Sequence, residues 1–176
     1  ILSNVTNYAL EHDPNIALTD TEAKKLELSL DIPESVLKKL GEDVQRNIKI
    51  VDEALEESEV NKFQTLVFAP SKESAINIAL FIRLKNGDAR AIVGDTPPDD
   101  RSKYIDDFKN NKLKVLVNYG VLTTGFDAPN IQAVIIARPT SSVVLYSQML
   151  GRGLRGEKMG GTKYCDIIDV HDNIMN

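Results

Sequence analysis

From Phe63 onward, short runs of β-branched and aliphatic residues alternate with segments of helical pattern. The strand-like runs lie at 65–69, 89–93, 113–117, 133–137 and 164–170, and the helical segments lie near 72–85, 98–110 and 142–151. Buried strands that alternate with helices are joined by crossover connections, which make neighbouring strands parallel. The pattern therefore predicts an α/β domain over residues 61–176. We expect a doubly wound, mainly parallel sheet with flanking helices, and ligands at the carboxyl ends of its strands.

The first 60 residues follow a different pattern, which indicates an α-helical extension before this domain. Thr19 or Asp20 can cap a short helix, and Pro33 opens a longer stretch with near-heptad apolar spacing that Gly41 is placed to interrupt. The extension carries 6 Lys and Arg against 14 Asp and Glu, whereas residues 61–176 carry 15 against 12. We expect residues 1–60 to be an acidic helical linker or insert whose amphipathic face packs on the domain.

Composition excludes several classes of protein. The 176 residues suffice for one folded domain, and a net charge of -5 argues against a protein that coats nucleic acid by charge alone. No apolar run approaches the roughly 20 residues of a membrane span, and the first residues lack the basic start of a signal peptide. The sequence also does not begin with Met, which indicates that it is a piece of a longer chain. The single cysteine, Cys165, permits no internal disulfide and favours a cytoplasmic location, and His12 and His171 have no metal-ligand spacing.

The strongest motif is the segment 146–156, Tyr-Ser-Gln-Met-Leu-Gly-Arg-Gly-Leu-Arg-Gly. Arg152 and Arg155 are three residues apart at the end of a helical segment, so they share a face, and guanidinium groups match phosphate oxygens. Gln148 adds a neutral donor and acceptor one turn earlier, and Gly151 lets the backbone approach a partner closely. The alternative is a basic helix end favoured by the helix dipole. The same letters match a dinucleotide-binding pattern, but that pattern requires a preceding strand, which is missing here.

Three further segments follow strands and carry polar groups. The loop after 113–117 holds Asn118, Thr123, Thr124, Gly125 and Asp127, whose hydroxyls, backbone amides and carboxylate suit a phosphodiester backbone or a ribose. Ser71 and Lys72 open a helix whose N-terminus is a ready phosphate site. Arg101 follows Gly94-Asp95-Thr96-Pro97, with Thr96 as the expected helix cap. Each of these segments alone is equally compatible with an ordinary capped helix or a turn.

Taken in order, these segments resemble motifs four, four-a, five and six of superfamily two helicases, over roughly residues 63–170. The stretch from Val121 to Gly156 is similar to RadD-like DNA repair helicases and to the helicase subunits of restriction enzymes. The resemblance implies a RecA-like fold in which Arg152 and Arg155 reach the γ-phosphate of ATP. It places Gln148, Gly125, Asp127 and Gly151 near the nucleotide. Contacts with the nucleic-acid backbone are expected from the following residues: Ser71, Lys72, Asn118, Thr123, Thr124 and Arg101.

The sequence lacks a phosphate-binding Gly-x-x-x-x-Gly-Lys-Ser/Thr loop and an Asp-Glu box, which would hold the phosphates and Mg²⁺. The resemblance therefore implies that ATP and Mg²⁺ are held mainly by an N-terminal RecA-like domain of the same polypeptide. We expect this chain alone to be inactive and the full-length protein to be an ATP-dependent helicase or translocase, with DNA favoured over RNA. The alternative is a non-catalytic binding module with a helicase-like fold.

Overall fold

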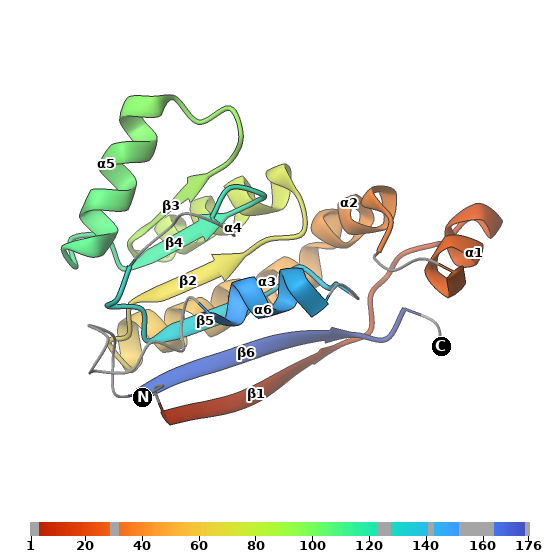
Figure 1. Ribbon diagram of the computed structural model, residues 1–176, viewed down its shortest axis with the longest axis horizontal. Coiled ribbons are helices and arrows are strands. Elements are labelled where there is room, and N and C mark those ends of the chain that lie inside the picture. The colour runs from red at the N-terminus through yellow and green to blue at the C-terminus, as the bar shows by residue number, and fades with distance from the viewer. Residues whose placement is uncertain (1–3, 29–31, 123–127, 141–142, 152–163, 175–176) are drawn as a thin grey trace.

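The computed structural model describes residues 4–28, 32–122, 128–140, 143–151 and 164–174. Their centre is a six-stranded sheet with the strand order β1-β6-β5-β2-β4-β3, in which all neighbours are parallel (Figure 1). The strands are β1 Asn4–His12, β2 Thr65–Phe68, β3 Ala89–Ile92, β4 Val115–Asn118, β5 Ala133–Ile136 and β6 Tyr164–Asp172. The predicted parallel α/β sheet is therefore confirmed.

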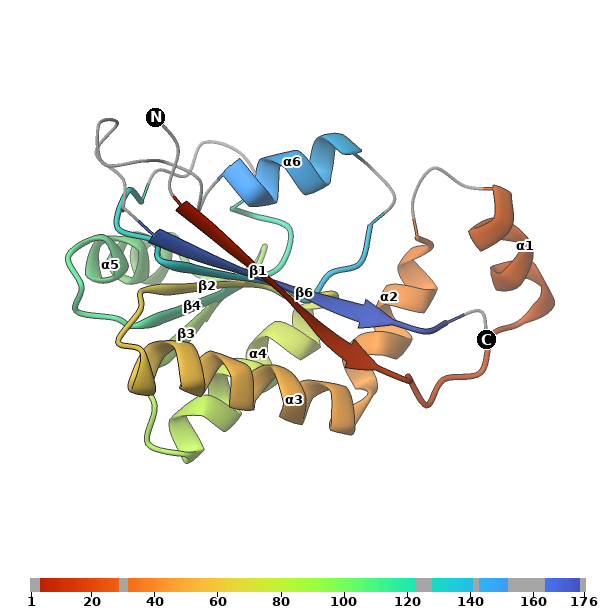
Figure 2. The same cartoon turned by 90° about the horizontal axis from the view of Figure 1, so that it is seen from below.

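Helices cover both faces of the sheet, as a doubly wound fold requires. They are α1 Asp20–Leu28, α2 Glu34–Glu42, α3 Val44–Leu55 with a π-helical turn η1 Glu56–Val60, α4 Lys72–Leu84, α5 Pro98–Lys109 and α6 Val143–Gly151. Figure 2 shows α3 and α4 on one face and α6 on the other. Successive strand residues point to opposite faces, so Val67 packs in the cluster under α3 and α4, whereas Leu66 and Phe68 pack with α5 and α6. No helix among these described ranges is long and apolar enough to cross a membrane.

The described part of the extension after Thr19 is mainly helical, but the expectation of helix in the extension is wrong for Asn4–His12. That segment is β1, which pairs in parallel with β6 from Asn4↔Tyr164 to His12↔Asp172. Most of its side chains are exposed, so backbone pairing with the edge of β6, rather than a buried apolar face, holds it extended. The local sequence does not reveal this partner, because it lies about 160 residues further along the chain.

Two helices of the extension, α1 and α3, begin at residues whose side chains cap them. Thr19 and Glu22 form a reciprocal capping box, in which the Glu22 amide donates to Thr19 Oγ1 at 3.2 Å and the Thr19 amide donates to Glu22 Oε2 at 2.9 Å. The long stretch after Pro33 divides into α2 and α3 at Asp43, not at Gly41. Asp43 Oδ1 accepts a hydrogen bond from the amide of Arg46 and so caps α3.

Helix α3 is part of the main core. Ile50, Val51 and Ala54 are buried against α4 and the sheet. Arg46 is fully buried, and its Nε and Nη2 donate to the two carboxylate oxygens of Asp172 in β6 at 2.8 and 2.9 Å. Residues before 61 therefore contribute a strand, a helix and a buried ion pair to the same sheet and core as residues 61–176.

Candidate functional site

The carboxyl ends of β2 and β4 bring two of the predicted site segments together. The amide of Ala69, just after β2, donates to the carbonyl of Asn118, the last residue of β4, at 2.8 Å. Ser71 follows two residues later, and its Oγ accepts from the Ser74 amide at 3.1 Å, so it caps α4 as predicted. Helix α2 lies beyond these strand ends (Figure 1), and a Cβ on its Gly41 would lie 2.2 Å from Ser71 Oγ. Only glycine permits this close approach of α2 to the start of α4.

Lys72 and Arg101 join the loop after β3 to this edge. Lys72 forms an exposed ion pair with Asp95, and this hydrogen bond raises the pKa of Lys72 above its ordinary value. Arg101 Nη2 donates to the carbonyls of Val93 and Gly94 at 3.3 and 3.4 Å, so its side chain folds back on the loop. Thr96 does not cap α5 as expected. Pro97 occupies the cap position, and Thr96 Oγ1 accepts from the Val93 amide at 2.9 Å.

Asn118 is fully buried, and its Nδ2 donates to the carbonyl of Val67 at 2.9 Å. Its Oδ1 accepts no hydrogen bond from the described residues, which leaves one buried acceptor available at this edge. The side chain thus ties β4 to β2 at the point where both strands end. A role for Asn118 toward nucleic acid stays a prediction.

Three further residues at this edge were not predicted. The hydroxyl of Tyr119 donates to the carboxylate of Glu34 in α2, and this bond raises the pKa of Tyr119. The guanidinium of Arg138 lies over the Tyr119 ring, 5.9 Å from its centroid, in a cation–π arrangement. Tyr119 and Arg138 each follow a strand closely, so the carboxyl-end rule applied to β4 and β5 would have found both. The carboxyl-end rule does not point to Glu34, because this residue lies at the start of α2 in the extension and does not follow a strand of the predicted sheet.

A surface hollow of about 190 Å³ forms where these groups meet. Two carboxylates lie among the cationic and hydroxyl groups of its lining, which consists of Glu34, Ser35 and Lys38 from α2, Pro70, Ser71, Lys72 and Glu73 around the start of α4, and Tyr119 after β4. Two amines, two hydroxyls of serine and an aromatic ring are groups that bind phosphates and stack on bases. We call this set of residues the carboxyl-edge site.

Helix α6 carries the described part of the second predicted site. The Tyr146 hydroxyl donates to Asp169 Oδ2 at 2.8 Å, and burial, followed by this bond, raises the pKa of Tyr146 to about 12. Met149 is fully buried, Gln148 is half-buried and Gly151 is exposed, with no atom within 4 Å of a Cβ built on it. Met149 and Tyr146 therefore fix the helix on the sheet, while its last residue faces open space.

The structure does not bring Gly151 to the carboxyl edge. Tyr146 bonds Asp169, which is in register with Ile136 at the end of β5. From there α6 runs back toward the amino ends of the strands, as both ribbon views show (Figures 1 and 2). The expectation that all of the motifs meet at one edge is thus wrong for the end of α6, because the helix returns along the sheet. The remaining predicted residues lie outside the described ranges: Thr123, Thr124, Gly125, Asp127, Arg152 and Arg155.

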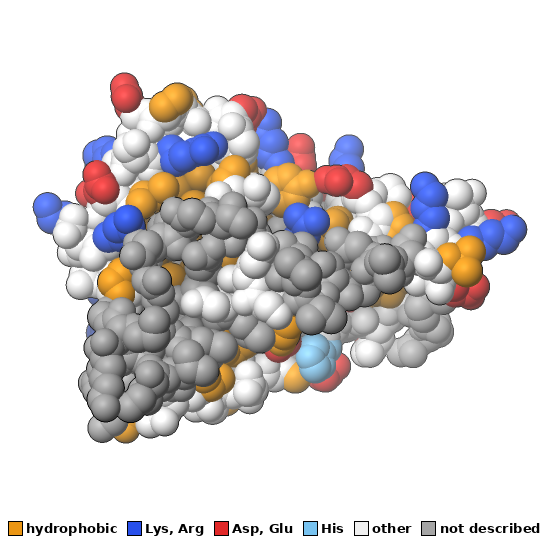
Figure 3. Space-filling view, viewed as in Figure 1, with side chains coloured by type: hydrophobic (Ala, Val, Ile, Leu, Met, Phe, Trp, Pro, Cys, Tyr) orange, Lys and Arg blue, Asp and Glu red, His pale blue; other side chains and the backbone are white. Residues whose placement is uncertain are grey.

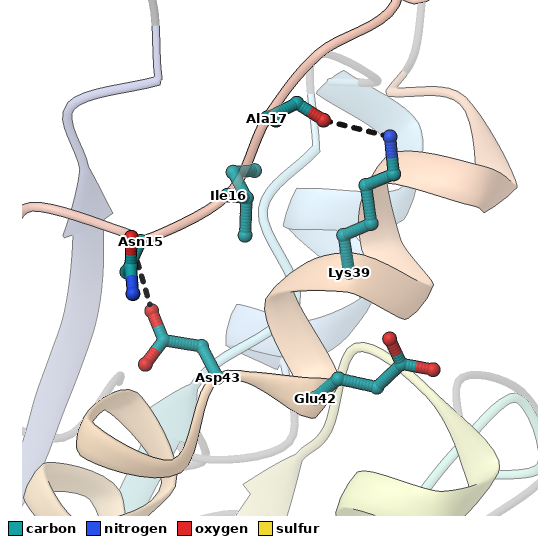
Figure 4. A pocket seen from close by; sticks show the side chains of 6 residues that line it. All are labelled: Asn15, Ile16, Ala17, Lys39, Glu42 and Asp43. Carbon is teal, nitrogen blue, oxygen red and sulfur yellow. Dashed lines mark hydrogen bonds between the residues drawn. The ribbon is translucent and has the colours of Figure 1, made fainter.

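A second hollow, shown in Figure 4, lies between the linker after β1 and the junction of α2 with α3. Its polar groups bond to one another: the Asn15 amide donates to Asp43 Oδ2 at 3.1 Å, and Lys39 Nζ donates to the Ala17 carbonyl at 2.7 Å. Asp43 also bonds His12 Nε2 at 2.8 Å. These bonds fasten the end of β1 and the linker to α2. Among the ranges that the structure describes, no group of three or more His, Cys, Asp or Glu side chains is placed to hold a metal ion.

A parallel, doubly wound sheet with polar loops at its carboxyl edge defines a RecA-like α/β domain. The family model of the helicase conserved C-terminal domain matches residues 46–157, and the chain belongs to this family. The match begins at Arg46 and so includes most of helix α3.

Relatives support the same assignment. The irc3 protein of Schizosaccharomyces pombe, a candidate mitochondrial ATP-dependent helicase, is 39% identical over 114 residues, which are 65% of this chain and 18% of that protein. IRC3 of Saccharomyces cerevisiae, also a candidate ATP-dependent helicase, is 30% identical over 161 residues, 84% of this chain and 23% of that protein. The chain thus spans about a fifth of the length of these relatives.

Among solved structures, a fragment of a candidate HsdR subunit of a type I restriction enzyme from Vibrio vulnificus superimposes with a TM-score of 0.67. The superposition covers 96% of this chain and 32% of the Vibrio vulnificus chain at 20% sequence identity, which shows that the two share a fold.

Proposed function

We propose that this chain is the C-terminal motor domain of an ATP-dependent DNA helicase or translocase. In this role it supplies Arg152 and Arg155 to a nucleotide and holds the nucleic-acid backbone at the carboxyl-edge site. Family membership and the motif from Gln148 to Arg155 carry the proposal. A charged pair of arginines at this position favours a motor over a binding module, because a scaffold has no need of both.

The described part of α6 fits one side of a shared nucleotide site. The helix is anchored by Met149 and Tyr146, and the space around Gly151 is open, so a second domain has room to approach it. ATP and Mg²⁺ would be held mainly by an N-terminal RecA-like domain of the longer polypeptide, since this sequence has no phosphate loop. Arg152 and Arg155 would then stabilise the charge that develops on the γ-phosphate, with Gln148, Gly125 and Asp127 beside the nucleotide.

The carboxyl-edge site would hold the backbone of the strand. Lys72 offers an ammonium, Ser71 and Ser35 offer hydroxyls, and Tyr119 offers a ring for stacking. Asn118, Arg101, Thr123 and Thr124 complete the proposed contacts. DNA is the proposed strand because the segment from Val121 to Gly156 resembles DNA repair helicases and the helicase subunits of restriction enzymes.

The decisive experiment is Arg152→Ala in the full-length protein, with Lys109→Ala on the exposed end of α5 as a control. Loss of an arginine finger lowers turnover by about 10³–10⁵. We therefore expect nucleic-acid-stimulated ATP hydrolysis to fall by that order in Arg152→Ala, with ATP affinity retained, and to persist in Lys109→Ala. Unchanged turnover would contradict the motor role and favour the non-catalytic binding module. Parallel assays with DNA and RNA of the same sequence test the choice of strand.

A further inference from the structure

A pocket of about 440 Å³ lies on the open edge of the sheet, against β3 and between α4 and α5. Its lining consists of Ile76, Ala79, Arg83, Arg90, Ala91 and Tyr104, and we call it the β3 arginine pocket. Arg83 lies in the last turn of α4, and Arg90 is in register with Leu116 near the middle of β4. The pocket therefore lies away from the ends of β2 and β4 and is distinct from the carboxyl-edge site.

The two arginines of this pocket are held in place by one backbone oxygen. Arg83 Nη1 donates to the carbonyl of Ala89 at 3.0 Å, and Arg90 Nη1 donates to the same carbonyl at 2.8 Å. A guanidinium has five N–H donors, so this single bond leaves most of the donors of each side chain available. Both arginines are half-buried.

Neither guanidinium forms an ion pair with a carboxylate of the described ranges. This distinguishes them from Lys72, Lys85 and Lys103, which each pair with an aspartate. Because both guanidinium groups contact the same oxygen, two like charges lie a few ångströms apart, and neither forms an ion pair with a carboxylate of the described residues. The charge of Arg90 also acts on Lys103 of α5, whose own charge is paired with Asp107. An anion placed between Arg83 and Arg90 would relieve the repulsion between their charges.

Charged side chains on an edge strand can simply prevent pairing with another sheet. That role requires only a solvated charge on the edge. It does not require two arginines from different elements to be fixed on one carbonyl beside a pocket. Figure 3 shows Lys and Arg side chains interspersed with Asp and Glu side chains over the α5 side of the molecule, so the proposed site rests on Arg83 and Arg90 themselves and not on a broad basic surface.

We propose that the β3 arginine pocket is a second anion site, which binds a phosphate group. Guanidinium groups bind phosphate oxygens with two parallel N–H bonds, and Arg83 and Arg90 present such groups from two directions. Tyr104 and the apolar residues Ile76 and Ala79 form the rest of the lining. The phosphate belongs either to a nucleic-acid strand that extends past the motor site or to a free polyphosphate. This proposal does not depend on the arginine fingers or on the carboxyl-edge site.

The test compares Arg83→Gln/Arg90→Gln with Lys109→Gln, an exposed control on α5, in the full-length protein with the nucleotide site saturated with ADP. One arm measures binding of a fluorescent single-stranded oligonucleotide between 50 and 300 mM salt (roughly the range over which counterion release is resolved). The other arm measures pyrophosphate binding by calorimetry. We expect the double variant to bind at least one probe about tenfold more weakly or worse. For the oligonucleotide we also expect the slope of log affinity against log salt to fall by about one to two.

A loss confined to the oligonucleotide identifies a strand, and a loss confined to pyrophosphate identifies a free polyphosphate. If both probes bind the double variant and the control equally, the proposal is wrong. Melting temperatures of the variants within a few degrees of the parent separate loss of binding from loss of fold. Arg83→Lys/Arg90→Lys keeps the charge but not the paired N–H geometry, so we expect an intermediate affinity.

Discussion

Replacing Arg46 by Met would show how strongly the extension is joined to the domain. Arg46 is fully buried in α3, and its partner Asp172 in β6 has a side chain only 1% exposed. Besides its two bonds to this carboxylate, Arg46 Nη2 donates to the carbonyl of Ala137, just after β5, at 2.5 Å. A methionine fills much of the space of the arginine stem, so the change removes mainly the charge and the hydrogen bonds.

The expected cost follows from the carboxylate that is left behind. Breaking a buried ion pair by removing one partner costs about 3–5 kcal/mol, because the other charge stays buried and uncompensated. Total stabilities of domains are about 5–15 kcal/mol, so Arg46→Met should remove a large fraction. Replacing both charges by apolar residues is often neutral, and we therefore expect Arg46→Met/Asp172→Leu to recover most of the loss.

Urea unfolding of the 176-residue chain, followed by circular dichroism, measures these free energies. Lys49→Met is the matched control, since Lys49 lies on the same helix with an exposed side chain that bonds only the Glu11 carbonyl among the described residues. We expect the control to change the free energy of unfolding by less than about 0.5 kcal/mol. A loss below about 1 kcal/mol for Arg46→Met would refute the reasoning, as would a double variant no more stable than the single one.

Two further predictions concern stability. Gly41→Ala should lower the free energy of unfolding by about 1–2 kcal/mol, because the new Cβ meets Ser71 Oγ and disturbs the cap of α4, which outweighs the gain in helix propensity. The control is Gly151→Ala, whose Cβ meets no other atom of the described residues, and it should leave the free energy of unfolding unchanged or higher in the same urea assay. Burial, together with the bond and charge of Asp166, raises the pKa of Glu57 to about 8. The folded state therefore binds more protons than the unfolded state between about pH 4.5 and 8, so stability should fall with rising pH across this window, by at most about 1.4 kcal/mol per pH unit. Urea titrations at several pH values measure how the free energy of unfolding depends on pH. Glu57→Gln should make this dependence weaker, and an unchanged dependence would mean that other groups cause it.

The sequence predicted those parts of the fold that are encoded locally. Strands β2 to β6 are short β-branched runs between helical patterns, and Ser71 and Thr19 are capping residues with recognisable spacing. β1 was missed because its extended form depends on a distant edge. The break at Asp43 was missed because an aspartate cap is less conspicuous than a glycine.

The candidate site was predicted in part. Ser71, Lys72, Arg101 and Asn118 lie where the carboxyl-end rule places them, although Asn118 and Arg101 bond the backbone of their own domain. Residues that other elements contribute to the site, such as Glu34, which accepts a hydrogen bond from the Tyr119 hydroxyl, are placed there by packing that no local sequence pattern encodes. The roles of Arg152, Arg155 and Asp127 stay predictions from sequence.

The pairing of β1 with β6 sets an order on how the chain can fold. Nine residues from the start of the chain pair with nine that are synthesised about 160 residues later. Contacts of such long sequence separation carry a large loop-closure cost and slow folding. During synthesis β1 therefore waits, unpaired, until Asp172 has emerged from the ribosome, whereas β2, β3 and β4 can already assemble with α4 and α5 between them. β1 thus spends longer during synthesis without its native partner than β2, β3 or β4 does.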